Sequence, residues 1–281
     1  MTAQLMTAAR WLAGAAAALP LAALAELQPY NMPVGVTDIS REVFGLHMLI
    51  FWICVAIGVV VFGAMLVSLV RHRKSRGYEA QQFHDSTTAE IAWTVVPFLI
   101  LVAMAVPATQ VLIKMEDTAR ADLTIKITGY QWLWHYEYLD QDIDFYSALS
   151  TPREQIYDLQ AKGEHYLLEV DNELVLPTNR KVRFLITSND VLHAWWVPDF
   201  AVKKDAIPGF INESWTEIEE PGVYRGQCAE LCGRDHGFMP VVVRAVAPDE
   251  YERWLADQRA EQPLASAETP AEPPAQPPAE Q

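Results

Sequence analysis

Several side chains that bind soft metal ions stand close together near residue 230. Cys228 and Cys232 are followed by His236 and Met239, and a second imidazole, His193, lies upstream. Two thiolates, two imidazoles and a thioether suit copper better than magnesium, calcium or a structural zinc. The set therefore predicts a redox-active metal and, with it, electron transfer.

A disulfide, a zinc site or a site for a single copper would each use fewer of these residues. A disulfide between Cys228 and Cys232 leaves His236 and Met239 without a role. Structural zinc takes four Cys or His ligands, so a nearby Met fits it poorly. A mononuclear blue-copper site uses only one Cys, and the chain lacks the Cys-x-x-Cys-His sequence that attaches haem. Two thiolates can instead bridge two metal ions, which favours a dinuclear copper site.

The ligands need a scaffold, and the sequence predicts a β-rich domain over residues 116–247. Short runs of β-favouring residues, most of them alternating between apolar and polar, occur at 123–128, 166–170, 182–187 and 241–246. Turn signals such as Pro208-Gly209 separate these runs. The layout is typical of an all-β sandwich or barrel, with the metal ligands on loops at one end.

Two apolar segments before this domain predict a transmembrane hairpin over residues 44–115. The runs 44–70 and 91–113 are long enough to cross a bilayer. The loop between them, 71–90, opens with a dense cluster of Arg and Lys, which the positive-inside rule places in the cytoplasm. The β-rich domain then lies in the periplasm of a bacterium, and the chain crosses the inner membrane twice.

Both ends of the chain differ from the rest in composition. Residues 1–25 resemble an export signal peptide, with Arg10 before an apolar run and small residues at the expected cleavage position after Ala25; an uncleaved amphipathic anchor is the alternative. Residues 26–43 would then form a periplasmic segment. At the other end we expect an amphipathic helix at 248–260 and a disordered Pro-, Ala- and Glu-rich tail at 261–281.

The overall charge limits the class of partner. The formal net charge is −15 and the pI is about 4.8, which disfavours nucleic acid and favours a basic protein.

Several separated motifs resemble one known family. The sequence from Gly226 to Met239, with the upstream Asp190-Val191-Leu192-His193, is similar to the CuA motif of subunit II of haem-copper cytochrome c oxidases. The aromatic run 129–138 and the segment 204–209 match that family as well, and the resemblance covers roughly residues 27–255. It implies an α+β membrane protein in which a two-helix transmembrane hairpin precedes a cupredoxin-like Greek-key barrel.

The resemblance also implies roles for the ligands. Cys228 and Cys232 would bridge two copper ions, while His193 and His236 would each bind one of them and Met239 would be a weak ligand. Glu230 would offer its backbone carbonyl to copper. Its carboxylate would bind Mg²⁺ or Mn²⁺ at the junction with the catalytic subunit.

Further roles follow from the same resemblance. Trp132 would be the residue at which electrons enter from a basic cytochrome c, and Glu90 would mark the mouth of a proton pathway. The partners would be the catalytic haem-copper subunit I and subunit III. Exposed acids would steer the cytochrome by their negative field: Glu137, Asp140, Asp171, Asp190 and Asp205.

Two other classes of function compete, and the family pattern is not complete. A membrane-anchored copper chaperone or thiol oxidoreductase also uses Cys-x-x-x-Cys and a His, but on a thioredoxin-like fold. A metal-free quinol-oxidase counterpart gives no reason for keeping the five side chains together. Leu133 replaces a common Tyr, which puts the aromatic docking patch in doubt, and Phe210 replaces a basic residue at the partner contact.

Overall fold

The computed structural model describes residues 31–79, 82 and 84–265. The expected signal peptide and most of the expected tail lie outside the described residues. The chain divides into two compact units, Met1–Val34 and Gly35–Gln281, and the second contains every element discussed below.

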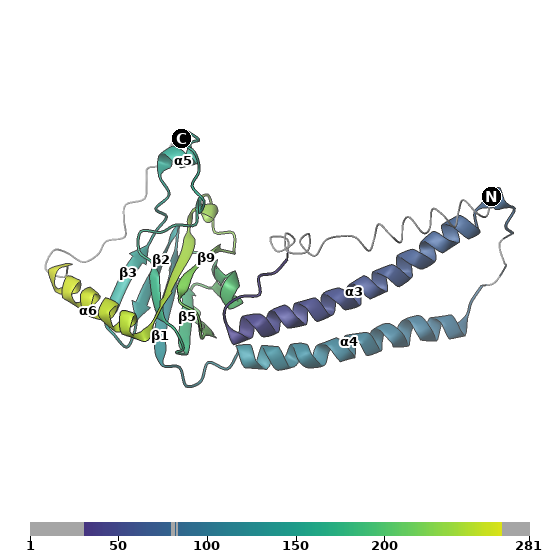
Figure 1. The fold of residues 1–281 in the computed structure, drawn as a ribbon, viewed down its shortest axis with the longest axis horizontal. Helices are drawn as coiled ribbons and strands as arrows, with labels where there is room; N and C mark the ends of the chain where they lie inside the picture. The colour runs from purple at the N-terminus through teal and green to yellow at the C-terminus, as the bar shows by residue number, and fades with distance from the viewer. Residues whose placement is uncertain (1–30, 80–81, 83, 266–281) are drawn as a thin grey trace. The chain divides into compact units, whose positions relative to one another are not determined.

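Two long helices form the predicted hairpin (Figure 1). Helix α3 spans Asp38–Arg71 and α4 spans Thr87–Met115, and both are long and apolar enough to cross a membrane. Helix α3 begins six residues before the predicted start at 44, because Thr37 and Ser40 form a capping box that closes its first turn. A 3₁₀ turn, η2 (Lys74–Arg76), lies in the basic loop between the helices.

The rest of the second unit is built from two five-stranded sheets. The first runs in the order β3-β2-β1-β5-β8: Ile143–Ser147, Leu133–Tyr138, Leu123–Tyr130, Val182–Ser188 and Asn212–Thr216. The second runs in the order β4-β10-β9-β6-β7: Leu174–Pro177, Pro240–Val246, Gly222–Cys228, His193–Val197 and Val202–Ala206. Most neighbours are antiparallel, but β1 pairs with β5 and β10 with β4 in parallel. This is the cupredoxin-like layout that the sequence predicted.

Aromatic side chains fill the space between the sheets. Trp134, Tyr136 and Tyr138 alternate along β2 and are all fully buried, as a strand with one face inward requires. Two polar contacts join the sheets across this core. The Tyr138 hydroxyl donates to the carbonyl of Val175 on β4 at 2.8 Å, and the Trp195 indole donates to the Tyr136 hydroxyl at 3.3 Å.

Two sequence predictions for local structure were wrong. The run 166–170 forms turns rather than a strand, because Leu167 takes a left-handed backbone conformation with φ of 62°; Val170 alone makes a bridge, to Leu149. The C-terminal helix α6 spans Pro248–Ala265 and continues past the predicted end at 260.

Four loops meet at one end of the barrel, which we call the ligand end. They connect β1 to β2, β5 to β6, β7 to β8 and β9 to β10. Backbone contacts fasten them together: Ser188 bridges Pro208, and the Ala229 amide donates to the Ala194 carbonyl at 3.0 Å. Side chains far apart in the sequence are thereby brought to one place.

Candidate metal centre

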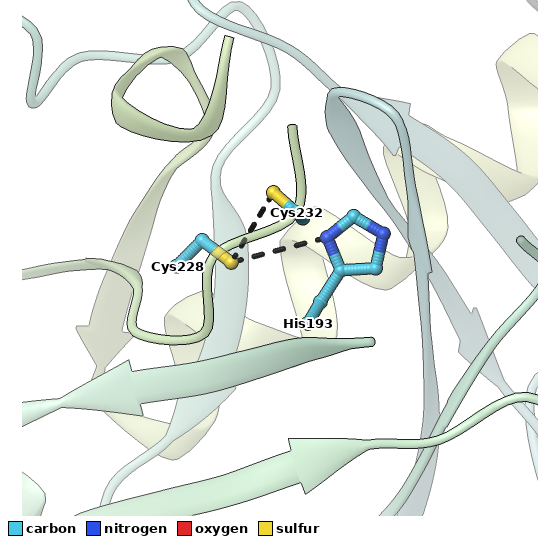
Figure 2. Close-up of side chains that lie close together, drawn as sticks. All are labelled: His193, Cys228 and Cys232. Atoms are coloured by element: carbon cyan, nitrogen blue, oxygen red, sulfur yellow. Dashed lines mark hydrogen bonds between the residues drawn. The ribbon is translucent and has the colours of Figure 1, made fainter. Parts of the chain in front are cut away.

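The ligand end gathers two thiols and an imidazole in the protein interior. The ligand atoms of His193, Cys228 and Cys232 all lie within 4.8 Å of one another, and all three side chains are buried. Figure 2 shows the Cys228 sulfur in contact with both other groups, 3.9 Å from the Cys232 sulfur and 3.9 Å from Nδ1 of His193. The chain's three cysteines are free, and the third, Cys54, lies apart on α3.

The remaining predicted ligands complete the same cluster. Nδ1 of His236 lies 3.4 Å from the Cys232 sulfur, and the Met239 sulfur lies 3.5 Å from it. The backbone carbonyl of Glu230 faces the Cys228 sulfur at 3.3 Å. Every side chain that the sequence proposed as a copper ligand is therefore within reach of one of the two thiols.

The β9–β10 loop carries most of these groups and is closed at its base. Strand β9 ends at Cys228, whose amide donates to the Met239 carbonyl at 3.2 Å just before β10 begins. A short 3₁₀ turn, η4 (His236–Phe238), carries His236 back toward the thiols. Gly233 permits the turn because its φ of 118° is strained for any residue with a side chain.

His193 is fixed from three sides. Its Nε2 lies 2.9 Å from a carboxylate oxygen of Asp190, and the ring of Trp134 meets it edge-on at 5.9 Å. On a third side lies Gly129 of β1, where an added Cβ would come within 2.8 Å of the imidazole. Nδ1 is left to face the thiols, so the bond to Asp190 leaves Nδ1 as the nitrogen available to a metal.

Burial shifts the pKa of two groups in the cluster, His193 and Cys232. It lowers the pKa of His193, although the Asp190 carboxylate opposes this, so the imidazole is neutral and able to ligate. Burial and the neighbouring Cys228 raise the pKa of the Cys232 thiol to about 12. At neutral pH this thiol is protonated in the metal-free chain, and metal binding must displace its proton.

The donor set fits copper. Buried sulfur and imidazole donors with a thioether suit copper, whereas magnesium and calcium require oxygen ligands. Two sulfurs 3.9 Å apart with separate partners, His193 at Cys228 and His236 at Cys232, suit two metal ions better than one.

Trp132 lies directly against the ligand loop. It stands in the turn before β2, half-buried, and its indole donates to the backbone carbonyl of Cys232 at 3.2 Å. The Gln131 side chain donates to the same carbonyl at 2.8 Å. The guanidinium of Arg234, which the sequence analysis did not single out, lies over the indole at 5.6 Å from the ring centroid.

The acids expected to steer a cytochrome differ in their surroundings. The Asp190 carboxylate lies 2.9 Å from Nε2 of His193 and accepts from the backbone amide of Gln131 at 2.7 Å. Burial acts to raise the pKa of Asp190, but these hydrogen bonds together outweigh burial and the pKa is lowered. Glu137 pairs with Lys126 at 2.6 Å. The carboxylates of Asp140 and Asp171 accept backbone amides, and Asp205 is exposed.

Three other positions singled out in the sequence, Leu133, Glu230 and Glu90, differ in burial. Leu133 is buried, so its replacement of Tyr does not change an exposed patch. The Glu230 carboxylate is exposed and pairs with no cation in the described part of the chain. Glu90 lies in the first turn of α4, exposed and remote in sequence from the copper ligands.

Comparison with known proteins identifies a family that this chain resembles. The family model "Cytochrome C oxidase subunit II, periplasmic domain" matches residues 123–246, and the model of the transmembrane domain of the same subunit matches 25–111. A probable cytochrome c oxidase subunit 2 of Rickettsia prowazekii is 41% identical over 238 residues, 84% of this chain and 73% of that protein. Cytochrome c oxidase subunit 2 of Cereibacter sphaeroides is 35% identical over 245 residues, 83% of this chain and 79% of that protein. A solved periplasmic domain of the Bradyrhizobium japonicum subunit II is 42% identical, covering 51% of this chain and 98% of that structure with a TM-score of 0.46.

The chain has a two-helix membrane hairpin followed in sequence by a β-barrel that gathers thiols and imidazoles at one end. These features define a membrane-anchored copper protein with a periplasmic domain. The chain belongs to the family of cytochrome c oxidase subunit II. It is therefore a subunit of an oxidoreductase complex of the haem-copper type, and the copper-chaperone alternative is not favoured.

We expect Asp190→Asn to weaken copper binding about 10- to 100-fold, the usual cost of losing a partner that orients a ligand. The amide cannot hold the imidazole as a carboxylate does, so Nδ1 loses its fixed direction. Competition against a copper chelator, with the full chain in detergent, measures the effect. The matched control is Asp257→Asn on α6, which removes the same charge from an exposed position. Equal affinity in both variants would contradict the role given to Asp190.

Proposed function

We propose that this chain is the electron-entry subunit of its oxidase, taking electrons from a basic cytochrome c and passing them toward haem in the catalytic subunit I. The observation that carries the proposal is the convergence of the predicted ligands on two thiols. Six groups would hold two copper ions: the side chains of His193, Cys228, Cys232, His236 and Met239 and the carbonyl of Glu230. When bound, such a copper pair accepts one electron, shares it between both ions and passes it on.

The protein's contribution is rigidity. His193 is locked by Asp190 and Gly129, and the β9–β10 loop is closed at its base by Cys228 and Met239. Buried side chains held in this way change position little when the charge at the centre changes. A small rearrangement is what fast electron transfer requires.

The ligand assignment is tested by copper content and electron paramagnetic resonance of the full chain in detergent. Wild-type protein should bind two coppers that share one unpaired electron. Cys232→Ser should abolish the shared signal, because one sulfur bridge is lost. Cys54→Ser, on α3 and outside the cluster, is the control and should keep it. One copper per chain in the wild type would overturn the proposal.

Glu230 is proposed to serve two metals through two different groups. Its carbonyl points inward to Cys228, while its exposed carboxylate would bind Mg²⁺ or Mn²⁺ at the junction with the catalytic subunit. In the assembled oxidase, Glu230→Gln should keep the copper signal and lose the resonance of bound Mn²⁺. Retention of the manganese signal would sink this assignment.

Trp132 is proposed as the entry point for electrons. Its indole N–H bonds to the carbonyl of Cys232, so a continuous bonded path leads from its ring to a copper ligand. In the assembled oxidase, Trp132→Leu should slow oxidation of cytochrome c about tenfold or more, a rise in barrier of about 1.4 kcal/mol, with copper content unchanged. Trp196→Leu, on the outer face of β6 near Lys203, is the matched control. Equal rates in the two variants would contradict the entry role.

Glu90 is proposed to lie at the mouth of a proton pathway on the cytoplasmic side, where its exposed carboxylate can take protons from water. Glu90→Gln should slow proton uptake by the oxidase in vesicles, and Glu90→Asp should restore it. The neighbouring Asp85→Asn serves as the charge-matched control. Proton uptake by Glu90→Gln at the wild-type rate would contradict the proposed role.

Subunit III of the oxidase is the remaining proposed partner of this chain.

A further inference from the structure

A cavity lies where the membrane hairpin joins the barrel, away from the copper ligands. Its volume is about 200 Å³, and its walls come from the first turn of α3, the last turn of α4, the end of β8 and the 3₁₀ turn η3 (Pro198–Phe200). Both helices are long and apolar enough to cross a membrane, and the cavity lies at the ends that meet the periplasmic domain. It therefore lies at the level of the lipid headgroups.

Trp215 ties the barrel to the hairpin beside this cavity. Its indole donates to the carbonyl of Lys114, in the last turn of α4, at 3.2 Å, and the ammonium of Lys181 lies over its ring at 4.2 Å from the centroid. Trp and Lys side chains are typical of the headgroup layer, because each has an apolar part and a polar end. The preceding residues of α4, Leu112 and Ile113, are 56% and 68% exposed, which leaves an apolar surface for acyl chains.

The charges at the cavity favour a positively charged ligand. Three carboxylates line it: Asp38, Glu217 and Glu219. The guanidinium of Arg41 pairs with the first and the third of them, and Lys114, which also lines the cavity, pairs with Glu42 at 2.5 Å. Glu217 is exposed and pairs with no cation in the described part of the chain. Its charge is left for a ligand of opposite sign.

The hydroxyl of Thr216 is an independent sign of a ligand. Thr216 lines the cavity and is only 2% exposed, and its hydroxyl has no hydrogen-bond partner among the residues that the structure describes. A buried hydroxyl without a partner destabilises a protein, so such groups are normally satisfied. Thr216 and Glu217 thus offer two oxygen acceptors side by side in the chain.

A primary ammonium group meets these requirements. It is small and positively charged, and its three N–H donors can serve the Glu217 carboxylate and the Thr216 hydroxyl together. A membrane presents this group in phospholipids with an ethanolamine headgroup. The phosphate of such a lipid is negatively charged, and Lys114 supplies a cation at the membrane side of the same cavity.

We propose that this cavity is a headgroup site for an aminophospholipid. The ammonium group binds Glu217 and Thr216, the phosphate lies at Lys114, and the acyl chains run along Leu112 and Ile113. The bound lipid contacts β8 and both helices, and so holds the barrel at the membrane surface. This site is separate from the copper centre and goes beyond the proposed function.

The choice of headgroup is tested by native mass spectrometry of the full chain in detergent. Phosphatidylethanolamine should bind about tenfold more tightly than phosphatidylcholine, which has the same charges but no N–H donor, and than phosphatidylglycerol, which lacks the cation. Glycerophosphoethanolamine, the same headgroup without acyl chains, should not displace the lipid at equal concentration. Equal affinity for the lipids would overturn the proposal, and displacement by the soluble headgroup would replace the lipid with a soluble ligand.

Two substitutions test the acceptors. Glu217→Gln should weaken binding of phosphatidylethanolamine about tenfold, because it removes the charge from one hydrogen bond. Thr216→Val should also weaken binding, yet the lipid-free chain should unfold at the wild-type temperature or above, since an unsatisfied hydroxyl is removed. The matched control is Glu220→Gln, an exposed acid nearby that does not line the cavity and should keep the wild-type affinity. Wild-type affinity in Glu217→Gln or Thr216→Val would contradict the assigned contacts.

The whole oxidase shows whether the lipid occupies the cavity in the complex. Purified oxidase with Glu217→Gln should retain less phosphatidylethanolamine per complex than oxidase with wild-type chain or with Glu220→Gln, as measured by mass spectrometry of the extracted lipid. Equal lipid content in all of them would mean that another subunit covers the cavity, and the proposal would be wrong.

Discussion

A single carboxylate joins the parts of this molecule that must act together. Asp190 accepts from Nε2 of His193, from the amide of Gln131 and from the amide of Val191 at 2.6 Å. The first contact fixes a proposed metal ligand, the second fixes the turn that carries Trp132, and the third shapes the β5–β6 loop. An acid that the sequence favoured as a docking charge is therefore mainly a positioning group. Its charge is largely satisfied by hydrogen bonds inside the protein, whereas the Asp205 carboxylate is exposed.

The barrel explains why so few residues are needed to hold the centre. Pairs of adjacent strands bring the loops together, and the aromatic core is packed beneath the loops and prevents them from moving inward. Trp134 shows the connection: it is fully buried in the core, touches His193 edge-on and donates to the Met239 carbonyl at 3.4 Å. The same contacts of Trp134 therefore pack the core and fix the positions of His193 and Met239. A change to the core at this point would be felt by both His193 and Met239.

Most of the fold could be predicted from the sequence, and so could the clustering of the proposed ligands, because both depend on residue type and spacing. Alternation on β2 reports directly on burial, the length of the apolar runs reports on membrane-spanning helices, and two Cys with a His and a Met report on a soft metal. Contacts between separate loops could not be predicted in this way. The approach of Gly129 to His193 and of Arg234 to Trp132 depends on strand register, which the sequence pattern does not state. The turn at Leu167 was missed because alternation alone does not reveal a left-handed residue.

Glu230 shows how one position can serve two environments. In the β9–β10 loop its carbonyl faces the buried Cys228 sulfur while its side chain faces solvent, and the next residue, Leu231, is 77% exposed. The loop therefore separates the buried thiols from solvent by little more than its own main chain. A group bound to the Glu230 carboxylate would lie one residue's length from the thiols. In the proposed function electrons enter through the indole of Trp132, which bonds to the carbonyl of Cys232, while the main chain at Glu230 makes a separate contact with the buried Cys228 sulfur.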